Sequence, residues 1–171
     1  MARIHKREKL VPGTHITIIE FINLCELELP FELQIVRVGT TLTQQLELYA
    51  KGRTTKGEPP YTEAKPLGQV VTFVNTVKRS AHARLAAVDV VPVVNGELKW
   101  GTKLHADLTR WYAIGALAER ITDGRGQPVY KWGGRFNRRD PLTGKRELMF
   151  DAGHVEFAGW EDITVPDFAH V

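Results

Sequence analysis

The segment SAHARLAAVDVV places a histidine and an aspartate where both could bind a metal ion. His82 precedes Asp89 by seven residues, and Asp89 lies among three valines in a segment typical of a buried strand. An ionised carboxylate is costly in such a place unless it is paired or bound to a metal. The pair is therefore a candidate for part of a metal site, although a structural hydrogen bond between the two side chains would fit the same pattern.

A second segment, FDAGHVEF, carries the same residue types beside another apolar strand. His154 follows Asp151 by three residues and precedes Glu156 by two. A catalytic zinc ion takes three protein ligands and keeps a fourth position for water, so the two segments could converge on one ion. We interpret the remaining histidines as structural or solvated: His5, His15, His105 and His170.

Length and composition favour one compact domain over residues 1–171, with a flexible basic start over 1–12. The chain is 43% hydrophobic and 25% charged, which suits a domain with a sizeable core. The single cysteine, Cys25, excludes a disulfide framework, and we expect a buried thiol. The net charge of +3 suits an anionic partner such as nucleic acid, lipid headgroups or cell-wall polymer. No apolar run is long enough for a bilayer, and the start lacks a secretory signal, so we expect folding in a cytoplasm.

Hydrophobic periodicity and turn residues predict a mixed α+β domain, with helices packed on a small, largely antiparallel sheet. A turn is expected at Asn95-Gly96. Residues 53–69 predict a long surface loop of the kind that borders binding clefts, and 135–147 a basic loop. Helices are expected over 12–30, 41–52 and 102–124, and strands over 31–38, 86–94, 128–134 and 154–160.

SAHARLAAVD resembles S-x-H-x-x-G-x-A-x-D, the zinc-binding motif of the D-alanyl-D-alanine carboxypeptidase and L-alanyl-D-glutamate endopeptidase family, which includes many phage endolysins. Three further segments occur in the family's order. LYAKGRT is similar to its LYAQGRT, YKWGG to its EWGG, and FDAGHVE to its closing D-x-x-H-x-E. The four matches span roughly residues 40 to 160. The resemblance implies a zinc D,D-peptidase or hedgehog-like fold.

Carried over position by position, the resemblance makes His82, Asp89 and His154 the ligands of a zinc ion (Zn2+) and Asp151 the catalytic carboxylate. Zinc polarises a scissile carbonyl, and a nearby carboxylate can move a proton from water to the leaving amine. Glu156 is the rival base, but its position two residues after His154 on a strand favours a hydrogen bond to that ligand.

Several positions near the motifs are less certain substrate or support residues. Ser80 matches the first position of the zinc motif, whereas Leu85 stands where the family has glycine. Thr40 occupies the place of a family arginine that can stabilise an oxyanion, so Arg37 or Arg53 would have to compensate, or zinc alone would serve. We favour Arg53 for this role, although an exposed loop arginine is as often only a solvated charge.

Trp132, followed by two glycines, could form a flat wall of a substrate cleft, or it could be a core residue of its strand. The basic loop could attract anionic wall polymer or outer-membrane lipid, or it could simply be solvated. Its basic residues are Arg135, Arg138, Arg139, Lys145 and Arg146.

The resemblance implies a phage or prophage endolysin that cleaves the stem peptide of bacterial peptidoglycan, most simply at L-alanyl-D-glutamate. Such an enzyme would stay in the host cytoplasm until the membrane is breached and then reach the periplasm and cell wall. We expect a monomer with no nucleic-acid partner and no stable membrane insertion. The alternatives are a D,D-carboxypeptidase, a D-alanyl-D-alanine dipeptidase, and a non-catalytic wall-binding or virion-associated relative.

Overall fold

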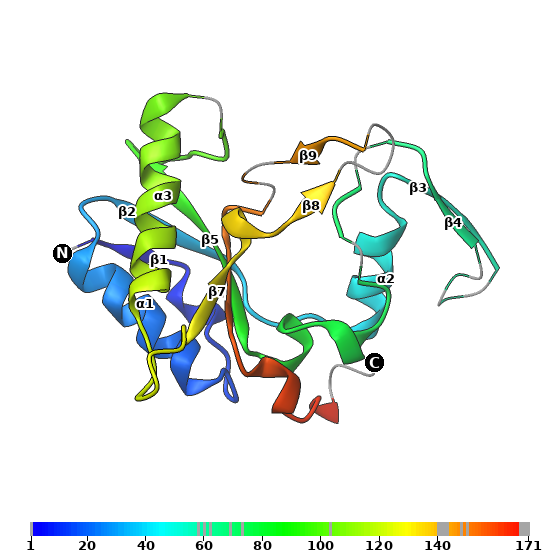
Figure 1. Cartoon of the computed structure of the whole chain (residues 1–171), viewed down its shortest axis with the longest axis horizontal. Helices are drawn as coiled ribbons and strands as arrows, with labels where there is room; N and C mark the ends of the chain where they lie inside the picture. Colours follow the sequence, from blue (N-terminus) through cyan, green and yellow to red (C-terminus); the bar gives the residue numbers. More distant parts are fainter. Residues whose placement is uncertain are drawn as a thin grey trace.

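A six-stranded sheet forms the centre of the protein (Figure 1). The structure is a computed structural model, and it describes residues 2–57, 59, 61, 63–68, 70–72, 74–102, 104–139, 144–147, 149 and 151–167. Five strands follow the order β1-β2-β5-β10-β7, and β6 pairs with β5. Only the β1–β2 pairing is parallel among these; the other described pairs are antiparallel. The strands are β1 (Ile4–His5), β2 (Glu32–Arg37), β5 (Ala87–Val94), β6 (Glu97–Leu98), β7 (Tyr130–Trp132) and β10 (His154–Phe157). The predicted α+β class with a largely antiparallel sheet is confirmed.

The apolar run of β5 makes it a central strand, because nearly all of its side chains are buried. It pairs with β2 on one side and with β10 on the other. The predicted turn follows β5, with Asn95 at φ 52° and Gly96 at φ 79°, the positive angles that suit a tight hairpin. The four predicted strands all exist, each within its expected range.

Two helices, α1 (Ile16–Glu28) and α3 (His105–Arg120), lie side by side against the sheet, at the left of Figure 1. Their apolar side chains form one core with the strands. Cys25 is fully buried there, as expected, and burial raises the pKa of its thiol far above the usual range. No helix in the described part of the chain is long and apolar enough to cross a bilayer.

The third predicted helix, α2 (Leu42–Ala50), stands apart from α1 and α3 (Figure 1). The Thr41 hydroxyl accepts a hydrogen bond from the backbone N–H of Gln44, and the Gln44 side chain accepts one from that of Thr41. This reciprocal capping explains where the helix begins. Four other short helices of the 3₁₀ type carry turns near the sheet: η2 (Val77–Arg79), η3 (His82–Arg84), η4 (Gly133–Arg135) and η5 (Trp160–Asp162).

Two segments predicted as loops contain short hairpins instead. The segment 53–69 forms β3 (Arg53–Lys56) and β4 (Glu63–Pro66), and the basic loop forms β8 (Arg138–Arg139) and β9 (Arg146–Glu147). The β3–β4 hairpin is mostly exposed and polar. It has no alternation of apolar residues, so hydrophobic periodicity could not reveal it.

The start of the chain also differs from the flexible segment expected over 1–12. Ile4–His5 pair with β2, and Ala2 and Ile4 belong to the hydrophobic core. The backbone N–H of Ala2 donates to the Glu26 carbonyl at 2.8 Å. A further short helix, η1 (Arg7–Lys9), follows β1. Two buried apolar side chains are enough to fix this segment to the sheet edge, although its many charges suggested otherwise.

Candidate metal centre

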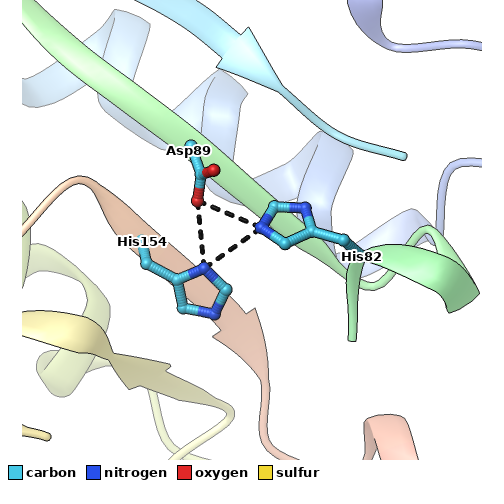
Figure 2. A group of neighbouring side chains, drawn as sticks. All are labelled: His82, Asp89 and His154. Atoms are coloured by element: carbon cyan, nitrogen blue, oxygen red, sulfur yellow. Dashed lines mark hydrogen bonds and ion pairs between the residues drawn. The ribbon is translucent and has the colours of Figure 1, made fainter. Parts of the chain in front are cut away.

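Three side chains from separate segments meet beside β5 (Figure 2). Asp89 lies in β5, and His82 lies in η3, the helical turn that leads into this strand. His154 is the first residue of β10, which pairs with β5 so that His154 is directly opposite Asp89. Cross-strand partners on one face lie within side-chain reach. The strand register therefore brings the third residue to the other two across 65 positions of sequence.

The three facing atoms form a nearly equilateral triangle. The distances are 3.1 Å from His82 Nε2 to Asp89 Oδ1, 3.0 Å from His154 Nδ1 to the same oxygen, and 3.2 Å between the two nitrogens. Ligands about 2.0 to 2.1 Å from a tetrahedral zinc ion lie about 3.3 to 3.4 Å from one another. The triangle is thus close to the face of such a tetrahedron, and two nitrogens with one carboxylate oxygen are a typical zinc donor set.

The outward-facing nitrogen of each histidine is held by an acceptor. His82 Nδ1–H donates to the Val38 carbonyl at 2.6 Å, and His154 Nε2–H donates to Glu156 Oε2 at 3.0 Å. These bonds leave His82 Nε2 and His154 Nδ1 to face the triangle. Metal-binding histidines commonly have such partners, which fix the ring and its tautomer.

The charges around the triangle favour an ionised Asp89. Burial alone would raise the pKa of Asp89, but the charge of His82, hydrogen bonds from both histidines and the charge of Arg37 hold it well below its usual range. Burial lowers the pKa of His82, and Asp89 offsets this only in part. For His154, hydrogen bonds to Asp89 and Glu156 overcome the effect of burial and raise the pKa to about 10. A cation can therefore replace the proton that this cluster holds on His154.

Asp151 lies next to the triangle without being one of its corners. It occupies the turn before β10, where its backbone carbonyl accepts a hydrogen bond from the His154 N–H at 2.9 Å. Its side chain lines the same cavity as the three candidate ligands. No hydrogen bond or ion pair of its carboxylate occurs with the described residues. Burial raises the pKa of Asp151, and the neighbouring Asp89 charge raises it further. A carboxyl group in this setting is suited to accept and release a proton.

Gly133 allows Asp151 and His154 to approach η4. A Cβ atom at Gly133 would lie 2.2 Å from the Asp151 carbonyl oxygen and 2.9 Å from His154 Cβ. Such contacts would force the turn before β10 to shift, so glycine is required here for close packing.

Glu156, the rival base, is already engaged on both oxygens. Oε2 accepts from His154, and Oε1 accepts from Trp160 Nε1 at 3.0 Å. Burial alone would raise the pKa of Glu156, but the hydrogen bond and charge of His154 lower it overall. These contacts suit an orienting partner of His154 better than a proton acceptor in the cavity.

The two arginines considered in place of Thr40 lie in different settings. Arg37 lines the cavity and contacts Asp89, whereas Arg53 is not among the residues that line it. Arg53 donates to the Tyr49 carbonyl at 2.6 Å and lies over the Tyr49 ring. Thr40 itself is buried and lines the cavity. Of the two arginines, therefore, the structure brings Arg37 to the site and not the favoured Arg53.

Ser80 and Trp132 are also predicted site residues, but only Ser80 lines the cavity. Ser80 lines the cavity, and its Oγ accepts from the Ala83 N–H at 3.3 Å, which supports the turn that carries His82. Trp132 is buried and donates from Nε1 to the Ala152 carbonyl at 2.8 Å. It is not among the cavity-lining residues, so its place is that of a core residue and not of a cleft wall.

The cavity has a volume of about 880 Å³, enough for several residues of a peptide. Its walls come from the end of β2, from α2, from Val71, Thr72 and Val74, and from the segment after η4. None of the described residues between 53 and 68 lines it, so the expected cleft border lies elsewhere. Phe136, which sequence reasoning missed, lines the cavity with its ring 5.6 Å from that of His154. In the sequence, Phe136 lies two residues after the YKWGG segment, and no other sequence feature points to it.

The remaining histidines lie apart from the cluster. His5 Nε2 is 2.7 Å from Glu32 Oε2, and His15 caps α1, accepting from the Thr17 N–H at 3.4 Å. His105 is the first, exposed residue of α3. His170 lies outside the described residues.

The sequence matches no protein-family model and no curated protein. The fold is similar to that of a solved structure, the crystal structure of the L-Ala D-Glu endopeptidase ChiX from Serratia marcescens, with a TM-score of 0.56. The likeness covers 90% of this chain and 86% of that chain, at 18% sequence identity. Its extent shows that the two chains share one fold over nearly their whole lengths.

Proposed function

We propose that this protein is a zinc-dependent peptidase that hydrolyses a peptide bond in the stem peptide of bacterial peptidoglycan. The observation that carries the proposal is the triangle of His82, Asp89 and His154 with a separate carboxyl group, Asp151, beside it in one cavity. The four short sequence motifs and the similarity in fold to an L-Ala D-Glu endopeptidase support it. On the same grounds we propose L-alanyl-D-glutamate as the bond that is cleaved.

His82 Nε2, Asp89 Oδ1 and His154 Nδ1 would hold the zinc ion, which when bound supplies a Lewis acid for the scissile carbonyl and for water. Asp151 acts as the proton carrier. Its raised pKa lets it take a proton from the attacking water and then deliver this proton to the leaving amine. Val38 and Glu156 hold the two imidazoles in the required tautomers. The cavity that holds this cluster is large enough for the peptide.

Digestion of purified peptidoglycan, followed by mass spectrometry, tests the reaction and the bond. We expect new N-terminal D-glutamyl or D-isoglutamyl fragments, their loss on chelation, and their return on addition of zinc. Release of terminal D-alanine would instead show a D,D-carboxypeptidase. A protein that binds zinc and wall polymer but yields no fragment would be a non-catalytic relative.

Matched variants separate metal binding from proton transfer. Asp151→Asn keeps the size of the side chain, so we expect it to bind zinc normally while turnover falls about 10²- to 10⁴-fold, the usual effect of removing a general base. His82→Ala should lose both zinc and turnover. Glu161→Gln, on the exposed helix η5, is the control and should change neither. Full turnover in Asp151→Asn would contradict the mechanism.

A narrower proposal concerns the biological setting. We propose a monomeric phage or prophage endolysin that stays in the host cytoplasm until the membrane is breached and then cuts the wall. Expression in a bacterial host, with and without a membrane-permeabilising protein, tests this order of events. Lysis only after permeabilisation is expected, whereas lysis by the protein alone would contradict it. Sedimentation of the purified protein tests the monomer.

A further inference from the structure

Arg37 reaches the candidate metal centre because β2 contains a bulge. Ile35 pairs with Val90, and the next paired position joins Arg37 to Asp89, so that Val36 is an extra residue in β2. A bulge bends the strand and redirects the side chains that follow it. Both Val36 and Arg37 consequently line the cavity, whereas Ile35 is fully buried in the core.

The guanidinium of Arg37 engages one oxygen of Asp89 through a hydrogen bond from Nε and an ion pair with Nη2. Nε lies 2.8 Å and Nη2 lies 2.7 Å from Asp89 Oδ2. The other oxygen, Oδ1, is the one that faces His82 and His154. The two oxygens of this carboxylate are therefore divided between an arginine on one side and the candidate ligand triangle on the other.

We propose that Arg37 is a positioning residue that makes Asp89 a one-oxygen ligand. By occupying Oδ2, it prevents the carboxylate from turning and placing both oxygens on the metal. Charge-assisted hydrogen bonds of this length are strong and directional. The role rests on the proposed metal centre, and it gives a function to an arginine beside a cation site, where its own positive charge opposes metal binding.

An ion pair that served only to stabilise the fold would leave the metal's coordination unchanged, so the test uses coordination as its readout. Arg37→Met removes both the hydrogen bond and the ion pair, and Arg37→Lys restores the positive charge with a single nitrogen. Arg120→Met is the matched control because it removes an arginine paired with Glu28, between α3 and α1 and outside the cavity. Circular dichroism of the metal-free variants checks that each is folded.

Cobalt(II) is the probe, because its visible absorption bands weaken when the coordination number rises from four to five. We expect Arg37→Met to show weaker bands and about 10- to 100-fold lower affinity for cobalt, as for other residues that orient metal ligands. Arg37→Lys should lie between wild type and Arg37→Met, and Arg120→Met should match wild type.

The direction of the change in metal affinity shows whether Arg37 acts on the metal only through its charge or by orienting Asp89. Loss of a positive charge alone would strengthen the binding of a cation, so a fall in affinity requires lost orientation of Asp89. Wild-type affinity and spectrum in Arg37→Met, or a rise in affinity, would overturn the role of Arg37 alone. Failure of the wild-type protein to take up cobalt or zinc would overturn the metal centre itself, and the role with it.

Discussion

Replacement of Leu85 by glycine and by alanine would measure the strain in the turn between two candidate metal ligands. Leu85 ends η3 in the left-handed conformation, with φ 55° and ψ 25°, and its side chain is buried in the core. The left-handed conformation costs a residue with a Cβ atom roughly 1 to 2 kcal/mol. The family that the sequence resembles has glycine here, and glycine adopts this conformation without that penalty.

The expected difference in stability between the alanine and glycine variants can be worked out by comparison with Leu33, which is fully buried in β2 and has no positive φ. At either position, truncation of leucine to alanine should cost about 2 to 5 kcal/mol. Going on to glycine at Leu33 removes a further methyl group, about 0.8 kcal/mol, and adds about 0.5 to 1 kcal/mol of chain entropy. Leu33→Gly should therefore be less stable than Leu33→Ala by about 1.5 kcal/mol. At Leu85, relief of the strain offsets this difference, so the two variants should be nearly equal.

Urea unfolding of all four variants in chelator, followed by circular dichroism, would provide these free energies of unfolding. If Leu85→Gly falls below Leu85→Ala by as much as the Leu33 pair differs, the left-handed conformation is not strained and the reasoning is wrong. Metal affinity of Leu85→Gly should stay at the wild-type value. The turn is held by backbone hydrogen bonds, from the Leu85 N–H to the His82 carbonyl at 3.0 Å and from the His15 N–H to the Leu85 carbonyl at 2.9 Å, and neither needs the side chain.

Three further predictions concern packing and pH. Gly133→Ala should lose about 1 to 3 kcal/mol of stability and bind metal more weakly, because its Cβ would collide with the Asp151 backbone. Gly124→Ala, where a Cβ meets open space, should do neither, and equal effects in both variants would contradict the packing argument. Burial raises the pKa of Tyr130 to about 12, so the contribution of Tyr130 to stability is complete below about pH 10 and is lost, by up to about 3 kcal/mol, as the pH rises to about 12. Urea unfolding from pH 9 to 12 should show a loss that is smaller in Tyr130→Phe than in wild type by about this amount; the loss that remains comes from the buried Cys25 thiol, whose pKa is also raised. Since the pKa of His154 in the metal-free protein is raised to about 10, zinc binding near pH 8 should release a proton, and the apparent affinity should rise about tenfold per pH unit up to that pKa. Calorimetry in two buffers with different ionisation enthalpies measures the proton, and buffer-independent heats would contradict this prediction.

Much of the fold could be predicted because its main elements have strong local patterns. The apolar run of β5 and the helical spacing of α3 indicate their structures without reference to any other segment. The short strands have no such signal. β1 depends on two buried side chains against α1 and β2, and the β3–β4 hairpin has few apolar residues, so both form through contacts that only the folded chain supplies.

In the candidate site, too, some residues could be predicted from local sequence motifs and others could not. The motifs identified His82, Asp89, His154 and Asp151, and the structure brings all four to one cavity. The position of Arg37 depends on one extra residue in β2, counted against the register of β5, and no local pattern in the sequence encodes that count.

The environment of Trp132 also could not be assigned from sequence, because an indole followed by two glycines suits a cleft wall and a core strand equally. A Cβ at Gly115 in α3 would lie 2.3 Å from the Trp132 ring, so the ring fills the space that this glycine leaves between helix and sheet. A Cβ at Gly134 would also lie 2.3 Å from this ring, so the burial of Trp132 depends on the distant Gly115 as well as on a glycine beside it.

Because of the place of β10 in the sheet, the ribosome would synthesise the residues of the candidate site in two separate stages. β10 is the last strand among the residues that the structure describes, yet it pairs between β5 and β7, both of which are synthesised earlier. Until it emerges, β5 and β7 lack their shared neighbour, and the emerging chain holds His82 and Asp89 without His154 or Asp151. Domains generally fold as units once their chain is available. A nascent chain would therefore carry an incomplete cluster until β10 is added, and insertion of this strand would complete the sheet and the candidate metal centre in one step.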